Sequence, residues 1–180
     1  MRFRFRYSLR GLGVMTAVIA AGLAWYVGRI RPQEQAVTAI WEAGGMVFYA
    51  DSPVNGSFVV ALDRSRWRRS FGAVRHVMLK GDGSGRGDVI CARLACLGSL
   101  CHLEVDSMQV EDADVVHLAR LDLLEVLSLN DNPITDEGLR HLAALPRLRS
   151  LDLGGTKVTE SGVATLRKRL PNCTIYWAKH

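Results

Sequence analysis

Cysteines and histidines are the side chains of this sequence that could bind a metal or form a covalent link. Cys91, Cys96 and Cys101 follow one another closely, and His102 comes directly after them. Such residues can hold a zinc ion, but Cys91 and also Cys173 align with apolar positions of the repeat described below, so both are expected to be small buried hydrophobic residues. A zinc site is therefore not predicted. Cys96 and Cys101 flank one expected helix-to-strand connection, so a disulfide between them stays open if the domain lies outside the cytoplasm.

A second candidate metal site is the pair His117 and His141, which are 24 residues apart. Thr165 takes the same position in the next copy, and no carboxylate joins the pair by its spacing, so a hydrated surface pair is expected. The glycine-rich run at 81–87 is not a phosphate-binding loop, because Asp88 follows it instead of lysine. The G-x-S-x-G, Walker and H-E-x-x-H patterns are also missing from the sequence. The sequence predicts no enzyme, no metal and no cofactor.

The residues that could form a binding surface are positioned by a pattern that repeats every 24 residues. Three copies begin at Leu97, Leu121 and Leu145, and their apolar residues stay in register throughout. In each copy apolar residues first alternate, as in a strand with one buried face, and later recur at helical spacing. Small and polar residues between these parts turn the chain. Each copy is expected to form a strand, a turn and a helix, which can bury their apolar sides only when the copies stack.

The stretch LEVLSLNDNPITDEGL at 124–139 resembles the leucine-rich-repeat family, whose pattern is L-x-x-L-x-L-x-x-N/T followed by V/I-T-D-x-G-L. The resemblance covers residues 73–178. It implies an α/β fold, a short right-handed leucine-rich-repeat solenoid of 24-residue strand-turn-helix units. The copy that begins at Leu97 departs from the pattern, because Met108 replaces the Asn/Thr and Asp114 replaces the Gly. This copy is expected to pack less regularly.

Both ends of the array need caps, because a bare terminal repeat would expose the core. An earlier and weaker copy starts near Val74 and is longer than the others, and the glycine-rich run absorbs the extra residues. Residues 33–72 before it are expected to form an N-terminal cap. Its predicted elements are a helix over 35–43, a β-rich segment at 46–50 and a short helix over 64–71. The C-terminus is expected to form a final half repeat in which Trp177 closes the core.

Residues between the buried strand positions are expected to face the concave side of the sheet. The copies place them in three rows, which are His76, His102, Val126, Ser150 and Thr174; Met78, Glu104, Ser128, Asp152 and Tyr176; and Lys80, Asp106, Asn130, Gly154 and Ala178. The residues predicted to bind a partner are His102, Glu104, Asp106, Ser128, Asn130, Ser150, Asp152 and Tyr176. The middle of this surface is polar and mildly acidic, with Glu104, Asp106 and Asp152 expected close together. Tyr176 is an aromatic residue of the kind that interface hot spots favour. Two interpretations stay open. The surface is either an ordinary hydrated sheet face or a docking surface for a basic or hydrogen-bonding partner.

The N-terminus combines positive charge with an apolar stretch. Residues 1–10 hold four arginines and no acid, and residues 11–28 hold no charged residue. This pattern predicts a basic cytoplasmic leader and a single transmembrane helix over 11–28. A helix of about 17 residues is roughly 25 Å long, slightly less than the ~30 Å hydrocarbon core, and the flanking arginines can extend it. The arginine excess places the N-terminus in the cytoplasm. A signal peptide cleaved near Ala24 and a buried helix are the alternatives.

The formal net charge of +5 does not indicate a nucleic-acid-binding domain. Residues 1–32 contain six arginines and no acid, whereas the rest contains 17 basic and 18 acidic residues and so has a net charge of −1. Nucleic-acid binding needs basic residues concentrated on the folded domain. The basic cluster at 64–69 is expected to be a solvated helix face, with contact to anionic lipid headgroups as the alternative. No nucleic-acid partner is predicted.

Four segments follow from these features. They are 1–10, the basic leader; 11–28, the transmembrane helix or signal anchor; 29–72, the linker and N-terminal cap; and 73–180, the leucine-rich-repeat domain. Many bacterial leucine-rich-repeat proteins begin in a similar way, with an R-x-Q-x-x-A-V-x-x-I helix that is found here at 31–40. The predicted function is a non-catalytic protein-binding module in the cytoplasmic membrane, with its repeats outside the cytoplasm. The alternative is a structural envelope protein or a secreted protein with a cleaved signal peptide and no specific ligand.

Overall fold

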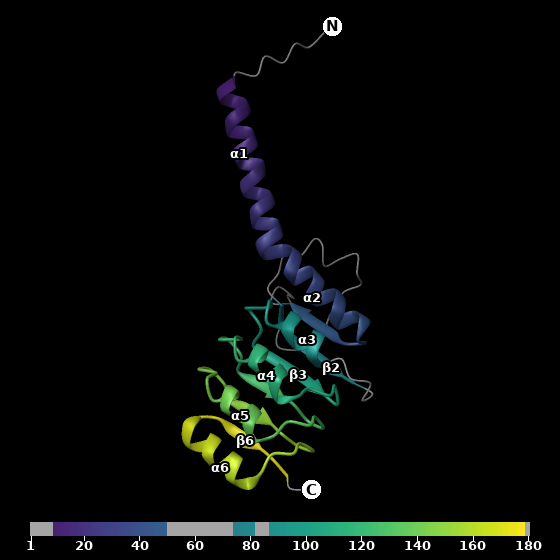
Figure 1. Cartoon of the computed structure of the whole chain (residues 1–180), viewed down its shortest axis with the longest axis vertical. Helices are drawn as coiled ribbons and strands as arrows, with labels where there is room; N and C mark the ends of the chain where they lie inside the picture. Colours follow the sequence, from purple (N-terminus) through teal and green to yellow (C-terminus); the bar gives the residue numbers. More distant parts are fainter. Residues whose placement is uncertain (1–8, 50–73, 82–86, 179–180) are drawn as a thin grey trace, which may run out of the picture.

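The structure, a computed structural model, describes residues 9–49, 74–81 and 87–178. Its elements in chain order are α1 (Leu9–Trp25), the π-helical segment η1 (Tyr26–Ile30), α2 (Arg31–Glu42), β1 (Met46–Tyr49), β2 (Val74–Lys80), α3 (Gly87–Leu94), β3 (His102–Asp106), α4 (Asp112–Leu118), β4 (Val126–Ser128), α5 (Asp136–Leu142), β5 (Ser150–Asp152), α6 (Glu160–Arg169) and β6 (Thr174–Tyr176). The strands stack into one sheet, and helices α2 to α6 follow one another along it, each in contact with the next (Figure 1).

A mainly parallel sheet carries the repeats. Its strand order is β1-β2-β3-β4-β5-β6, and β1 pairs with β2 in the antiparallel direction whereas β2 to β6 are parallel. Leu103, Leu127 and Leu151 occupy the same register on neighbouring strands. This pairing confirms the 24-residue alignment. Val77 pairs with Leu103, which confirms that the weak first copy is longer than the others.

The core is a continuous row of apolar side chains between the sheet and the helices. The central repeat contributes Leu127 and Leu129 from the strand side and Leu139 and Leu142 from the helix, all at most 3% exposed. Burying one leucine side chain stabilises a fold by about 1.5–3 kcal/mol. Because each repeat packs its apolar residues against those of its neighbours, the stack has one shared core. The structure thus confirms the predicted α/β solenoid with a parallel sheet.

A ladder of aspartates connects consecutive repeats. Asp112, in the first turn of α4, accepts hydrogen bonds from the backbone N–H of Thr135 at 2.8 Å and from its hydroxyl at 2.6 Å. Asp136 binds Thr159 of the following repeat at the same two distances. A Cβ atom at Gly138 would lie 2.5 Å from Oδ1 of Asp112, so the glycine makes room for the carboxylate. The aspartate in the first turn of α4 and of α5 therefore joins its repeat to the threonine that precedes the next helix.

The repeat that lacks this glycine starts its helix differently. Asp114 stands at the glycine position and accepts a hydrogen bond from the Glu111 backbone N–H at 2.9 Å, while the Glu111 carboxylate accepts one from the Asp114 N–H. This capping box satisfies two N–H groups at the helix start. Gln109, in the preceding turn, has a φ angle of 57°, which is uncommon for a residue other than glycine, whereas the positive φ of Ser107 is shared by its equivalents Asp131 and Gly155. The repeat is irregular here, as predicted, although Met108 remains buried.

The N-terminal cap consists of α2 and β1 in the part of the chain that the structure describes. Val37 and Ile40 on α2 are each 1% exposed and join the repeat core. Strand β1 extends the sheet beyond β2 and pairs with its free edge. The helix predicted over 35–43 and the β segment at 46–50 are both found, the helix starting earlier than predicted. The short helix predicted over 64–71 lies outside the described residues.

The C-terminal end is closed less completely than predicted. Ile175 is 6% exposed, but Trp177 keeps part of its side chain in solvent while it packs against the core. Cys173 was expected in the core and is also partly exposed. The reason is that β6 is the last strand of the sheet among the described residues, and none of these residues forms a repeat on its outer side. Partial burial still raises the pKa of the Cys173 thiol.

Cys91 lies where the repeat pattern places it. Cys91 is fully buried, as predicted, and this burial raises the pKa of its thiol well above the ordinary value. All four cysteines are free, so the disulfide that the sequence left open between Cys96 and Cys101 is not formed in the structure. Cys91 therefore serves as a small apolar side chain of the core.

The N-terminal helix extends away from the repeats. Helix α1 continues directly into η1 and then into α2 (Figure 1). Among the described residues, no helix combines the length and the apolar character needed to cross a membrane. The transmembrane helix predicted over 11–28 is therefore not confirmed, because regular α-helix ends at Trp25 after 17 residues. Residues 1–8 of the predicted leader lie outside the described residues.

Candidate functional site

The strand residues that point away from the core form rows across the sheet. Strand β3 alternates half-buried and buried side chains, so His102, Glu104 and Asp106 share one face. The register continues the first row through Val126, Ser150 and Thr174, and the second row through Ser128, Asp152 and Tyr176. Six of the eight predicted binding residues therefore lie in these two adjacent rows. The other two, Asp106 and Asn130, lie at or just beyond the C-terminal ends of their strands.

A hydrogen-bonded group forms around Asp106 at the ends of β3 and β4. Asp106 Oδ1 accepts from the Ser128 hydroxyl at 2.6 Å and from the Asn130 backbone N–H at 3.1 Å. The Asn130 side chain donates to Ser128 Oγ at 3.0 Å and accepts from the Gly154 N–H at 2.7 Å. These side chains hold one another in place. They would therefore lose little conformational freedom when a partner binds.

Glu104 lies between two histidines on strands β2 and β3. Its Oε1 atom is 3.0 Å from His102 Nε2 and 3.7 Å from His76 Nε2. The two imidazole rings stack, with their centroids 3.9 Å apart. Burial lowers the pKa of His76, His102 lowers it further, and the Glu104 carboxylate acts in the opposite direction. Three side chains that can bind a metal thus have their ligand atoms within 4.8 Å of one another.

The carboxylates that were expected close together are divided between the two ends of the surface. Glu104 and Asp152 share a row, but Ser128 on β4 stands between them, and neighbouring strands are about 4.8 Å apart. Asp152 Oδ1 accepts a hydrogen bond from the Gly154 N–H at 3.2 Å. Beside it, Tyr176 is 58% exposed on the last strand. The concave face therefore has a histidine–glutamate end and an aspartate–tyrosine end, with the Asp106 group near its middle.

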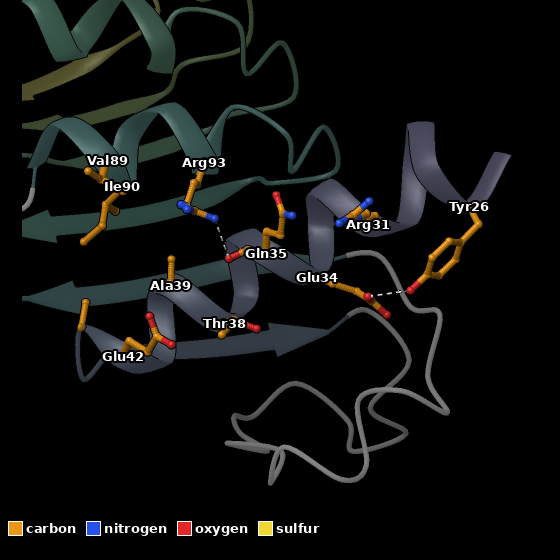
Figure 2. A pocket seen from close by; sticks show the side chains of 11 residues that line it. Tyr26, Arg31, Glu34, Gln35, Thr38, Ala39, Glu42, Val89, Ile90 and Arg93 are labelled. Atoms are coloured by element: carbon orange, nitrogen blue, oxygen red, sulfur yellow. Dashed lines mark hydrogen bonds between the residues drawn. The ribbon is translucent and has the colours of Figure 1, made fainter. Parts of the chain in front are cut away.

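Apart from the sheet face, the structure has a hollow between helices α2 and α3 (Figure 2). Its volume is about 620 Å³, and its lining includes Arg31 from the start of α2. Tyr26 donates a hydrogen bond to Glu34 Oε2 at 3.0 Å, and Arg93 donates one to the Gln35 carbonyl oxygen at 3.5 Å. Basic and acidic side chains are mixed here, so the hollow does not concentrate one sign of charge for a ligand. The repeat pattern does not predict this hollow, because its residues come from two segments that the pattern does not relate.

Residues 122–165 match the protein family described as Leucine Rich repeats (2 copies). This segment carries two leucine-rich repeats. The match spans the two copies that keep the family pattern, with Asn132 and Thr156 at the N/T position. It begins after the copy in which Met108 and Asp114 depart from that pattern. The start of the family match therefore coincides with the boundary between the irregular copy and the two copies that keep the pattern.

Among solved structures, the chain is similar to a leucine-rich-repeat protein of Leptospira interrogans, with 22% sequence identity and a TM-score of 0.38. The likeness covers 47% of this chain and 21% of the Leptospira protein, so this chain matches a minor part of that protein's length. A search of the curated proteins found no match. The family match supports a leucine-rich-repeat protein, and proteins of this kind are typically non-catalytic binding modules.

The sequence interpretation did not predict the group of His76, His102 and Glu104. Its signal was present, because His76 and His102 share a row and Glu104 follows two residues later on the same strand face. The 24-residue period points instead to His117 and His141, which lie partly buried on α4 and α5. His76 does not fit that period because the first copy is longer.

Proposed function

We propose that this leucine-rich-repeat chain is a non-catalytic protein-binding module and that the concave face of its sheet holds the partner. Stacked repeats of this kind create an extended concave surface, which such proteins use for binding. The observation that carries the proposal is the ordered set of hydrogen-bonding side chains on β3 to β6, which the strand register places in adjacent rows.

The chemistry of this surface favours a partner that is basic or rich in hydrogen-bond donors. Glu104, Asp106 and Asp152 supply carboxylate oxygen atoms, and a carboxylate pairs well with an arginine side chain through two parallel hydrogen bonds. The Asp106 carboxylate is already held in place by a 2.6 Å hydrogen bond from the Ser128 hydroxyl. Tyr176 adds an exposed aromatic ring beside Asp152, and tyrosine is common among the residues that dominate binding energy.

A photo-crosslinking aromatic amino acid at position 176 is expected to capture the partner in isolated membranes, because Tyr176 is exposed at the end of the proposed surface. Asp152→Lys is expected to reduce the affinity for the partner about tenfold or more, equivalent to about 1.4 kcal/mol. The reason is that the variant replaces an attractive charge with a repulsive one. The measurement is the dependence of crosslinked product on partner concentration, with a chelator present so that metal ions do not contribute.

Two matched controls lie on the helical side of the stack. Thr165 on α6 is exposed and takes the same crosslinker, and Glu160→Lys reverses an exposed charge there. Neither change should affect capture at the concave face. Equal crosslinking from positions 165 and 176, or capture that is unchanged by Asp152→Lys, would favour a structural protein without a specific ligand.

We further propose that residues 11–28 attach the chain to the cytoplasmic membrane, with the repeats outside the cytoplasm. Val18, Ile19 and Leu23 on α1 are 65%, 53% and 58% exposed. Residues 11–28 have no charge and would form a helix about 27 Å long, close to the ~30 Å hydrocarbon core. Trp25 at the end of this stretch suits the membrane–water interface, and the four arginines before it favour a cytoplasmic N-terminus.

A C-terminally tagged chain is expected to sediment with membranes and to lose its tag when protease is added to cells whose outer barrier is open. Ile19→Asp should release part of the protein, because an aspartate in the middle of a membrane helix costs roughly 2.5–3.5 kcal/mol. The readout is the tag in the membrane and soluble fractions. A shortened soluble tag would show a cleaved leader, and a membrane-bound tag that resists protease would show the opposite orientation.

A further inference from the structure

The junction between the N-terminal cap and the repeats brings three metal-ligating side chains to one face of the sheet. His76 comes from β2, the first strand of the repeat array, and His102 comes from β3 in the same register. Glu104 stands two residues after His102, so both side chains point to the same side of β3. The three residues are close because of strand pairing, and no loop of the chain has to place them.

The distances between these side chains suit a small divalent ion. Glu104 Oε1 is 3.0 Å from His102 Nε2 and 3.7 Å from His76 Nε2, and all three ligand atoms lie within 4.8 Å of one another. In a tetrahedral zinc site with bonds of about 2.0–2.1 Å, two ligand atoms are about 3.3 Å apart. The observed separations lie on either side of that value. Small rotations of the side chains would therefore bring the three atoms to zinc-binding positions without moving the strands.

The chemical nature of the three ligands also favours zinc. Two imidazole nitrogens and one carboxylate oxygen form a ligand set that binds zinc, and the fourth position is then free for water. The side chains of His76, His102 and Glu104 are 20%, 35% and 29% exposed, and although His76 Nε2 itself is buried, an ion can approach from the side of His102 and Glu104. The two imidazole rings are stacked with their centroids 3.9 Å apart, so they would have to rotate out of this stacking for both nitrogen lone pairs to point at one ion.

We propose that His76, His102 and Glu104 bind one zinc ion on the concave face, across the junction of β2 and β3. The ion would link β2, which pairs with the cap strand β1, to the next strand of the array, β3. Its remaining coordination position would face the solvent on the concave side. This site is separate from the four cysteines, of which Cys91 is buried in the core.

Titration of the full-length protein in detergent with zinc chloride tests the site, with isothermal calorimetry as the readout under reducing conditions. We expect one ion per chain from this site. His76→Gln and His102→Gln are each expected to weaken its binding at least about tenfold, because even residues that only orient metal ligands commonly contribute 10–100-fold to affinity. Glu104→Gln should weaken binding as well, and it changes the fold least. The matched control is His117→Gln with His141→Gln, which removes two histidines that stand 24 residues apart on the helical side.

Cobalt(II) distinguishes this site from binding by cysteine. A cobalt complex of imidazole and carboxylate shows visible d–d bands, whereas thiolate ligands add a strong charge-transfer band in the near ultraviolet. We expect the first without the second, and we expect the visible bands to disappear in His102→Gln. Zinc binding that is unchanged in His76→Gln and His102→Gln, a thiolate band at one equivalent of cobalt, or an equal loss in the His117/His141 control would overturn the proposal. Circular dichroism of each variant verifies that a lost site does not reflect a lost fold.

Discussion

Replacing Asn132 with leucine is expected to lower the free energy of unfolding by about 3–5 kcal/mol, because it leaves several buried backbone groups without partners. Asn132 is 1% exposed, and its side-chain oxygen accepts hydrogen bonds from the N–H groups of Met108 at 3.1 Å and Val110 at 3.0 Å. Its amide nitrogen donates to three carbonyl oxygens at 2.6, 3.0 and 3.1 Å, those of Val105, Leu129 and Asn130. Leucine has the same branching at Cγ but is larger and forms none of these bonds. Urea denaturation followed by circular dichroism measures the loss.

Thr156 provides the matched control because it occupies the same repeat position one copy later. Its hydroxyl makes one hydrogen bond, to the Leu153 carbonyl oxygen at 2.7 Å, and the residue is only partly buried. Thr156→Val keeps the shape and is expected to cost about 1 kcal/mol. If Asn132→Leu costs no more than Thr156→Val, the hydrogen bonds between the turns of neighbouring repeats are not a main source of stability. The expected difference would instead show that the middle repeat is secured by its turn as well as by its leucines.

The period of the sequence was sufficient to predict the sheet and the residues on its concave face. A 24-residue repeat identifies equivalent residues, and stacking places equivalent residues side by side, so Leu127 had to pair with Leu103 and Leu151. The same logic placed Glu104 beside Ser128. These predictions are confirmed because they depend on strand pairing, which the pattern of buried leucines determines.

Interactions between repeats were harder to predict because they depend on how side chains reach across a turn. The T-D-x-G motif indicates a helix start within one repeat, and it does not reveal that Asp112 binds Thr135 in the next one. His76 was correctly placed beside His102, but the row alone does not show that Glu104 lies within reach of both rings. For the N-terminal segment, the composition indicates an apolar helix, but it does not indicate that α-helix changes to π-helix after Trp25. Such a change depends on local backbone geometry.

Gly81→Ala is expected to lower the free energy of unfolding by about 2–3 kcal/mol, because the added methyl group has no room. Gly81 follows β2, and its N–H donates to the Asp106 carbonyl oxygen at 2.8 Å. A Cβ atom there would overlap the Ser107 carbonyl oxygen and would lie 2.7 Å from Met108 Sδ. The carbonyl belongs to the backbone of the next repeat and cannot rotate away. The substitution should therefore weaken the pairing of β2 with β3, and denaturation in urea measures the effect.

Gly98→Ala is the control for this substitution, because a Cβ atom at Gly98 would have no heavy atom within 4 Å among its surroundings. It is expected to change stability by less than about 0.5 kcal/mol. If both glycines tolerate alanine equally, the turn after β2 adjusts to the methyl group and the close approach to Ser107 does not stabilise the fold. A loss confined to Gly81→Ala would mean that the longer first copy depends on this contact to dock the cap onto the repeats. Because β2 also carries His76, the same variant should then weaken zinc binding without altering any ligand.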